Sequence, residues 1–261
     1  MKYGIPSLLE FRTAEQHMRF CAENDFDFFE LNLSFPWFQS DKLDVDNLVR
    51  LKKEYGKDYT IHLHDQSNPF DFSPEIREGS LKGVDYALTL AEKTGAKRLT
   101  LHLQNGMYSS IAGTKVYAYE VCKDEYLSNV EKAAGKWASR LKNTDAFFCI
   151  ENTSGFRNYH KQAIELMLQH REFGLTFDIG HNYKASEDDQ TFILSHRDRV
   201  KNFHIHDVTA KSNHVALGTG VLDIAGYLDL VKELDCPAVI EVKETAALLQ
   251  SMKFIYDMNR R

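Results

Sequence analysis

Short apolar runs alternate with longer amphipathic stretches along the 261 residues of the chain. The short runs are rich in β-branched and aromatic residues, which favours strands, whereas apolar residues in the longer stretches recur with the spacing of one helix face. The predicted strands are Lys2–Ile5, Phe26–Leu33, Tyr59–His64, Arg98–Leu103, Ala146–Glu151, Leu175–Asp178, Val200–His206 and Ala238–Val242. The predicted helices are Ala14–Glu23, Val45–Lys53, Pro74–Lys93, Asp124–Leu141, His160–His170, Asp188–His196, Ile224–Leu234 and Thr245–Asn259.

This alternation predicts strand–helix units at a spacing of roughly 30 residues, which fits a closed (β/α)8 barrel or an open doubly wound sheet. The positions of ionisable residues distinguish the two. An open sheet binds ligands mainly at the one crevice where its strand order reverses. Here such residues stand at the C-terminal ends of at least six predicted strands, and only a closed barrel brings these ends around one point. We therefore predict an α/β fold, a TIM barrel, with residues 1–261 forming a single domain.

Composition narrows the class of protein further. The chain is 43% hydrophobic, enough for one large core, and its formal charge of -6 does not support a broad basic face that follows nucleic acid. Its four cysteines are far apart and form no C-x-x-C pair, which suits reduced thiols. The N-terminus M-K-Y-G-I-P-S lacks a secretory signal, and no apolar run approaches the roughly 18 residues of a membrane span. We expect a cytoplasmic protein without a membrane segment.

Histidines and carboxylates occupy the predicted strand ends, as in T-I-H-L-H-D, F-C-I-E-N-T, T-F-D-I-G-H and F-H-I-H-D. Burying several charges together is costly unless they are paired or bind a metal, and imidazoles with carboxylates are good ligands for divalent ions. The set therefore predicts a metal site at the barrel mouth, with His62 and His206 weaker candidates that could instead orient their neighbours. The remaining histidines in helical stretches are expected on the surface: His17, His160, His170 and His196.

Together with their spacing, the motifs E-N-T-S-G, D-I-G-H, H-I-H-D and H-V-A-L-G-T-G resemble the xylose-isomerase-like barrel superfamily. This group contains sugar and sugar-phosphate isomerases and epimerases, and also abasic-site nucleases of the endonuclease IV type. Its epimerase pattern implies one metal, held by Glu151, Asp178, His204 and Glu241. Its nuclease pattern implies a second metal on His64 and His102, sharing Glu151 and Glu241, and a third on His181, His214 and an aspartate two residues before His214.

The sequence departs from the nuclease pattern at the last of these positions, which is Ser212. A neutral hydroxyl is a poor substitute for a carboxylate ligand, although Asp207 or water could partly replace it. The departure counts against a third metal and against three-metal cleavage of phosphodiesters. Without that metal, His181 and His214 are free to bind substrate oxygens.

The candidate substrate-binding residues are His181, His206, Trp37 and Glu30. Trp37 lies in the aromatic loop L-N-L-S-F-P-W-F, which either covers a small polyol or packs on a neighbouring helix. Glu30, predicted at a strand end, either reaches a substrate hydroxyl or is a solvated charge at the rim.

The leading hypothesis is a sugar or sugar-phosphate isomerase or epimerase that depends on one or two divalent ions, Mn²⁺, Zn²⁺ or Co²⁺. The metal would chelate a carbonyl and an adjacent hydroxyl while Glu151 and Glu241, on opposite sides of the barrel, move the proton. The alternatives are a metal-dependent phosphodiester hydrolase, a dehydratase on the same ligands, and a metal-binding barrel without catalysis. The expected partner is a small sugar, with nucleic acid disfavoured and a homo-oligomer left open.

Overall fold

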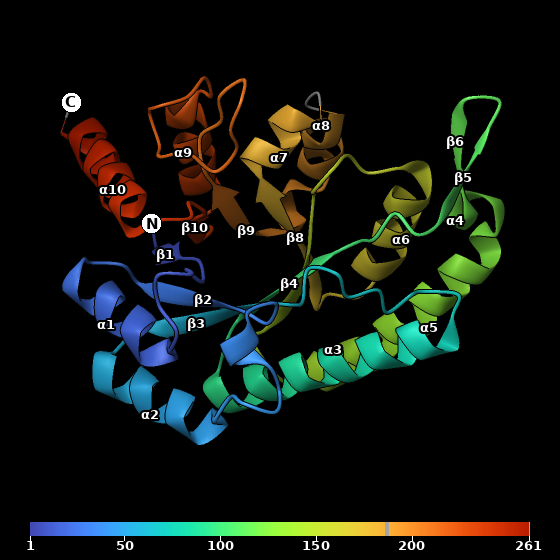
Figure 1. Cartoon of the computed structure of the whole chain (residues 1–261), viewed down its shortest axis with the longest axis horizontal. Helices are drawn as coiled ribbons and strands as arrows, with labels where there is room; N and C mark the ends of the chain where they lie inside the picture. The colour runs from blue at the N-terminus through green and yellow to red at the C-terminus, as the bar shows by residue number, and fades with distance from the viewer. Residues whose placement is uncertain (186–187, 261) are drawn as a thin grey trace.

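The computed structural model describes residues 1–185 and 188–260 and shows a closed barrel of parallel strands surrounded by helices (Figure 1). Around the barrel the order is β1-β2-β3-β4-β7-β8-β9-β10, and β10 pairs with β1. Their bounds are β1 Tyr3–Ile5, β2 Phe28–Asn32, β3 Asp58–His62, β4 Arg98–His102, β7 Phe147–Glu151, β8 Phe173–Asp178, β9 Val200–Ile205 and β10 Ala238–Ile240. The predicted TIM barrel is therefore confirmed.

Helices connect successive strands and cover the outside of the barrel. Their bounds are α1 Ala14–Glu23, α2 Val45–Tyr55, α3 Pro74–Thr94, α4 Ala118–Val121, α5 Lys123–Leu141, α6 Asn158–Leu168, α7 Ile179–Lys184, α8 Asp188–Ser195, α9 Ile224–Glu233 and α10 Thr245–Asn259, with short 3₁₀ helices η1 Pro36–Phe38 and η2 Arg197–Arg199. Pro74 occupies the first turn of α3, and the Asp223 carboxylate accepts the Gly226 N–H at the start of α9 over 3.1 Å. None of the described helices is both long and apolar enough to cross a membrane.

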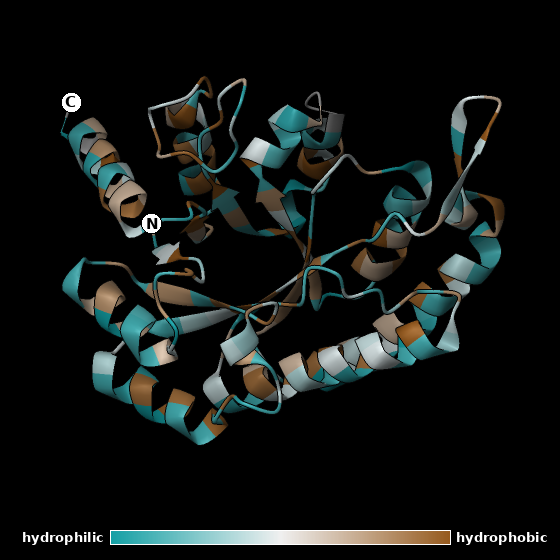
Figure 2. Ribbon diagram, viewed as in Figure 1, coloured by the Kyte–Doolittle hydropathy of each residue, from teal (hydrophilic) through white to brown (hydrophobic). Residues whose placement is uncertain are grey.

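The core lies between the barrel and its helices, where amphipathic helices bury one face. Figure 2 shows both hydrophilic and hydrophobic residues on the outer helices, as expected for helices with one buried face. Trp137 of α5 stacks on Phe148 of β7 with ring centroids 4.8 Å apart, and neither side chain is exposed. Truncating a buried aromatic of this kind to alanine typically costs about 3–5 kcal/mol. This packing holds the strand ends that carry the site.

The prediction missed the short helices α4 and α7 and a hairpin of β5 (Tyr108–Ile111) and β6 (Thr114–Tyr117), which extends away from the barrel beside α4 (Figure 1). Its turn residues Ala112 and Gly113 both have positive φ, 50° and 82°. Two-residue turns of this handedness are usually marked by Asn-Gly or Asp-Gly, and alanine gives little signal for them.

Two histidines predicted on the surface are buried. The His17 ring stacks on Phe29 at 4.2 Å, its Nε2 accepts the Leu8 N–H and its Nδ1 donates to the Thr13 carbonyl. His160 is 2% exposed and contacts the Gln104 carbonyl over 3.1 Å. Burial lowers the pKa of each imidazole to about 4. Both residues lie on the buried face of a helix and bond to main-chain groups, so the surface prediction was wrong for them.

Candidate metal centre

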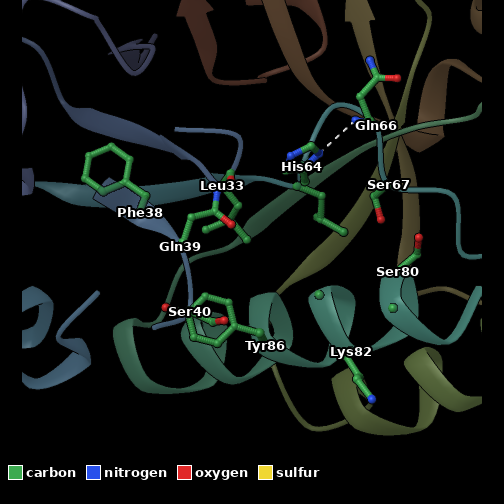
Figure 3. Close-up of a pocket in the computed structure, with 13 residues that line it drawn as sticks. Leu33, Phe38, Gln39, Ser40, His64, Gln66, Ser67, Ser80, Lys82 and Tyr86 are labelled. Atoms are coloured by element: carbon green, nitrogen blue, oxygen red, sulfur yellow. Dashed lines mark hydrogen bonds between the residues drawn. The ribbon is translucent and has the colours of Figure 1, made fainter. Parts of the chain in front are cut away.

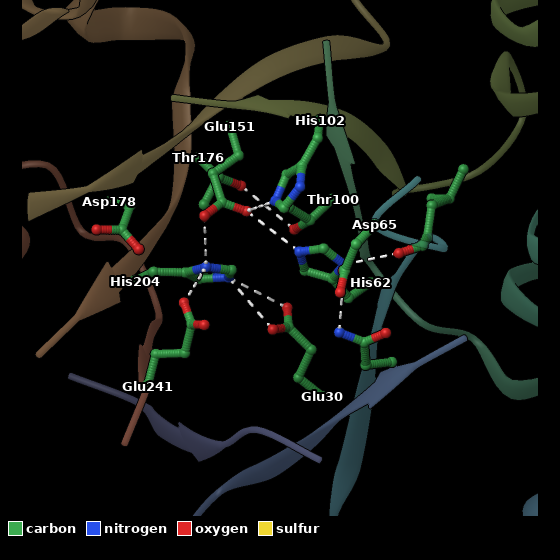
Figure 4. Close-up of polar contacts among 12 residues, drawn as sticks. Glu30, His62, Asp65, Thr100, His102, Glu151, Thr176, Asp178, His204 and Glu241 are labelled. Carbon is green, nitrogen blue, oxygen red and sulfur yellow. Dashed lines mark hydrogen bonds and ion pairs between the residues drawn. The ribbon is translucent and has the colours of Figure 1, made fainter. Parts of the chain in front are cut away.

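Four side chains meet at the C-terminal ends of neighbouring strands. Glu151 ends β7, Asp178 ends β8, His204 lies in β9 and Glu241 follows β10 directly. Each offers a ligand atom, and these atoms all lie within 4.8 Å of one another. Nδ1 of His204 is 3.2 Å from Oε1 of Glu151 and 2.9 Å from Oε2 of Glu241 (Figure 4). The structure thus brings together the four residues that the epimerase pattern implies.

Buried polar atoms without well-aligned hydrogen bonds mark the same place. Nδ1 of His204, Oε2 of Glu241 and Nε2 of His214 are such atoms, and their contacts are ion pairs, with Nδ1 of His204 2.9 Å from Oε2 of Glu241 and Nε2 of His214 3.2 Å from Oε1 of Glu241. Hydrogen bonds weaken steeply when their geometry is poor, so these lone pairs remain suited to a cation. A divalent cation that accepts these lone pairs would satisfy them, and imidazole nitrogens with carboxylate oxygens suit Zn²⁺ or Mn²⁺. The residues therefore fit a divalent metal.

The charges in the site favour the same conclusion. Burial alone would raise the pKa values of Glu151, Asp178 and Glu241, but neighbouring histidines, and Lys243 at Glu241, keep all three below their usual range. Burial would likewise lower the pKa of His204, but the Glu151 carboxylate and its neighbours raise it well above its usual value. Without metal, the ionised carboxylates are balanced by protonated imidazoles. A divalent ion would take the place of those protons.

A second group of possible ligands adjoins the first through Glu151. Its Oε2 lies 3.2 Å from Nε2 of His62 and 3.0 Å from Nε2 of His102. The Nδ1 of His62 donates to the Leu63 carbonyl over 2.7 Å, which directs Nε2 toward Glu151. Burial would lower the pKa of His62, but Glu151 raises it to about 9. The group also includes Asp65, so a second ion has a candidate site.

The structure places His62 in this group instead of the predicted ligand His64. Strand β3 ends at His62, two residues earlier than predicted, and the chain then leaves the strand alternation. His64 is exposed, its Nδ1 accepts the Gln66 N–H over 3.1 Å, and it lines a separate cavity of about 410 Å³ beside α3 (Figure 3). Alternation places residues two apart on one face only while the strand continues.

His206 is hydrogen-bonded to the proposed ligand Asp178. Its ring is fully buried, with Nε2 3.0 Å from Oδ1 of Asp178, while the His214 N–H donates to its Nδ1 over 3.2 Å. We assign the ring proton to Nε2, which then donates to the carboxylate and leaves no lone pair there for a metal. A Cβ on Gly180 would lie 1.9 Å from this ring, which explains the glycine of D-I-G-H. The predicted contact between His206 and substrate is therefore not supported by its position.

The third metal site lacks its carboxylate. Ser212 is exposed, and its backbone N–H and carbonyl both bond to Thr209. Asp207 cannot replace it, because its carboxylate accepts four backbone N–H groups between residues 208 and 222 at 2.7–3.1 Å. The carboxylate predicted two residues before His214 is therefore missing, although Asp178, His181, His206 and His214 still offer ligand atoms within 4.8 Å of one another.

The sequence did not indicate the role of Asn152 or the pairing of Lys243 with Glu241. Asn152 accepts the Asp178 N–H over 2.9 Å and donates to the Asp178 carbonyl over 2.8 Å, joining the ends of β7 and β8. Lys243 lies 2.7 Å from Oε1 of Glu241. The position of Asn152 directly after Glu151 in E-N-T was the available signal.

Glu30 and Trp37, which were also predicted to contact substrate, lie in surroundings that differ from those predicted. Glu30 stands in the middle of β2, is 2% exposed and faces His204 instead of the rim. Trp37 belongs to η1 and packs edge-on against Phe35 and Phe38, with ring centroids 5.4 Å and 6.2 Å away. These ring contacts of Trp37 lie within its own loop and not on a neighbouring helix, and its contact with substrate stays a prediction.

The fold and the site together define the class of protein, a TIM barrel with groups of possible metal ligands at the C-terminal ends of its strands. The model of the xylose isomerase-like TIM barrel family matches residues 18–258, and the chain belongs to this family. No curated protein sequence matched the chain.

Solved structures with the same fold include several sugar epimerases. A D-tagatose 3-epimerase-like protein is 20% identical with a TM-score of 0.79, covering 98% of this chain and 96% of that one. The D-allulose 3-epimerase from Methylomonas sp., in complex with D-allulose, is 16% identical with a TM-score of 0.74 over 98% and 96%. The IOLI protein with a bound zinc atom is 12% identical with a TM-score of 0.73 over 98% and 97%.

Proposed function

We propose that this protein is a metal-dependent sugar isomerase or epimerase that acts on a ketose or ketose phosphate. The observation that carries the proposal is the buried group of Glu151, Asp178, His204 and Glu241, in which two glutamates face the same imidazole nitrogen. The sugar epimerases among the proteins of similar fold support the same class of substrate.

Two carboxylates on different strands suit proton transfer at a carbon next to a carbonyl. A divalent ion bound in the site would polarise that carbonyl and stabilise negative charge on its oxygen. Strands β7 and β10 are separated by β8 and β9, so Glu151 and Glu241 approach the site from different directions. One removes the proton and the other returns it, which inverts the carbon if they act on opposite faces. Epimerisation needs both residues, whereas isomerisation needs one.

His181 is placed to orient the substrate. Its Nδ1 lies 3.1 Å from the Asn152 carbonyl, which accepts the ring proton and leaves Nε2 for a substrate oxygen. The side chain is 19% exposed, unlike the fully buried ring of His204. We therefore assign His181 to substrate binding and His204 to metal binding.

The group of His62, His102 and Glu151 favours a second candidate function, which is hydrolysis of a phosphodiester. In this reaction two metal ions that share Glu151 as a ligand would bind the phosphate together. Hydrolysis with three metal ions would need a third carboxylate ligand near His214. Ser212 cannot provide one, and the Asp207 carboxylate already accepts backbone N–H groups. We rank it second.

Solvent exchange into sugars tests the first proposal. Wild-type protein loaded with Mn²⁺ or Co²⁺ should incorporate deuterium from D₂O next to the carbonyl of a ketose, measured by NMR over a panel of ketoses and their phosphates. Glu151→Gln should abolish exchange, while Glu165→Gln, at an exposed helix position, should not change it. Absence of exchange into every sugar would overturn the proposal.

Metal content is measured on the same preparations. Glu241→Gln and Asp178→Asn each remove the charge of one proposed ligand, so bound metal per chain should fall while Glu165→Gln keeps the wild-type value. Full metal content and activity in both ligand variants would show that the metal is not held by this group.

A further inference from the structure

Glu30 forms a buried pair with a proposed metal ligand. Both of its carboxylate oxygens lie 3.3 Å from Nε2 of His204, and its side chain is 3% exposed (Figure 4). Thr60, which pairs with Glu30 across β2 and β3, lies with its hydroxyl 3.3 Å from the same carboxylate and donates to it. The carboxylate therefore contacts the edge of the imidazole opposite to Glu151 and Glu241.

The direct partners of this carboxylate are the His204 imidazole and the Thr60 hydroxyl. Its ion pair is with His204, and no lysine or arginine in residues 1–185 and 188–260 forms one with it. A buried charge is costly without a partner, so a carboxylate held only for packing would destabilise the barrel. An apolar side chain at position 30 would avoid this cost but could not bind His204. We therefore expect the contact between Glu30 and His204 to have a functional role.

The contact determines which nitrogen of His204 carries the proton when the other binds a metal. An ionised carboxylate can only accept, so Nε2 must donate to Glu30, and the lone pair then belongs to Nδ1. Nδ1 is the nitrogen that faces the other proposed ligands, 3.2 Å from Oε1 of Glu151 and 2.9 Å from Oε2 of Glu241. The fixed direction of the ring also prevents Nδ1 from turning away.

We infer that Glu30 is a positioning residue of the metal centre, which fixes the tautomer and direction of His204 from inside the barrel. It acts through His204 and does not contact substrate. A carboxylate that accepts the second N–H of a ligating imidazole makes the ligand more basic, and loss of such a partner typically weakens metal binding about 10–100-fold. The inference rests on the proposed metal-dependent function but not on the identity of the sugar.

The test is metal affinity, measured without any sugar. Mn²⁺ is titrated into metal-free protein in competition with a chelator, for wild type, Glu30→Gln and Glu30→Ala. We expect the dissociation constant to rise roughly 10-fold or more in Glu30→Gln, which keeps an acceptor but loses the charge, and further in Glu30→Ala. Thr60→Val, which removes the other partner of Glu30 without touching His204, serves as the matched control and should change it much less.

A spectroscopic measurement separates positioning from a general structural role. In the Co²⁺-loaded wild type, the Nε2 proton of His204 should give a paramagnetically shifted resonance that disappears in D₂O. It should persist in Glu30→Gln and be lost to solvent exchange in Glu30→Ala, while circular dichroism shows that both variants are folded. Unchanged metal affinity in both Glu30 variants would overturn the inference, as would a change confined to the KM for sugar. A wild type that binds no Mn²⁺ would instead refute the proposed function.

Discussion

Single residues of this site concentrate negative charge where water is excluded. Glu30, Glu151 and Asp178 are each at most 2% exposed, and each forms an ion pair with a histidine, His204 or His206. Histidine suits this task because it can hold a proton in the metal-free protein and release it when a cation binds.

Two other buried histidines, His17 and His160, contact no carboxylate among the described residues, and their surroundings keep them neutral. His17 is fully buried and uses both ring nitrogens to hold the chain at Leu8 and Thr13. Burial lowers its pKa from 6.5 to about 4. Since the folded pKa is below the unfolded one, its contribution to stability is complete above pH 6.5 and is lost as the pH falls toward 4.

We therefore predict that His17→Gln reduces the pH dependence of stability. Between pH 7 and pH 5, the free energy of unfolding of the wild type should fall by about 2 kcal/mol more than that of the variant. Urea unfolding at each pH, with a chelator present so that metal binding does not contribute, measures the difference. Equal slopes in the two proteins would contradict the role assigned to His17.

Among the elements, the loop after β9 is organised by one carboxylate. The Asp207 carboxylate accepts hydrogen bonds from the N–H groups of Val208, Gly218, Gly220 and Leu222. These bonds hold the segment H-V-A-L-G-T-G in a compact turn, which places His214 beside the site. A Cβ on Gly220 would lie 2.1 Å from the Val208 carbonyl oxygen and 2.3 Å from the Asp207 carboxylate, so glycine is required there.

The end of β3 decides which histidine joins the second ligand group. We predict that His62→Ala and His102→Ala each lower the number of metal ions bound per chain, or the affinity of the weaker ion, because both contact Glu151. His64→Ala should change neither, because His64 is exposed and belongs to none of the groups of possible ligands among the described residues. Elemental analysis and metal titration distinguish the three variants.

The outcomes have distinct meanings. If His64→Ala alone lowers metal binding, the nuclease-type ligand pattern holds and the chain after β3 rearranges on metal binding. If metal content holds in all three variants but the KM for sugar rises in His62→Ala and His102→Ala, these two residues bind substrate.

The limits of prediction from the sequence are clearest at such element ends. The barrel strands were predictable because strands buried on both faces appear as short apolar runs. The choice between His62 and His64 was not, because alternation puts both on one face and only the length of β3 separates them. The pairing of Glu30 with His204, 174 residues later in the chain, also needs the closed barrel to become visible.

For the whole molecule, the barrel gathers acidic ligands at one end while the chain as a whole carries a formal charge of -6. Two basic residues near the mouth are already engaged. Arg157 lies over the Tyr117 ring at 3.8 Å and bonds to Asn105, and Lys243 pairs with Glu241. Bound metal could reverse the local field, so net charge alone does not decide between a sugar and a polyanion as substrate.

The last prediction separates these two substrates. Proteins that hold DNA neutralise several phosphates with lysine and arginine, so their affinity falls steeply as salt rises. With Arg157 and Lys243 committed to other side chains, we expect no tight, salt-dependent binding of an abasic duplex and no cleavage of it by the metal-loaded protein. Fluorescence anisotropy at low and physiological salt measures binding, gel analysis measures incision, and an abasic-site nuclease provides the positive control. Incision at the rate of that control, with no exchange into any sugar, would reverse the order of the two proposed functions. Exchange into a ketose with an intact duplex would establish that this barrel uses its metal for sugar chemistry.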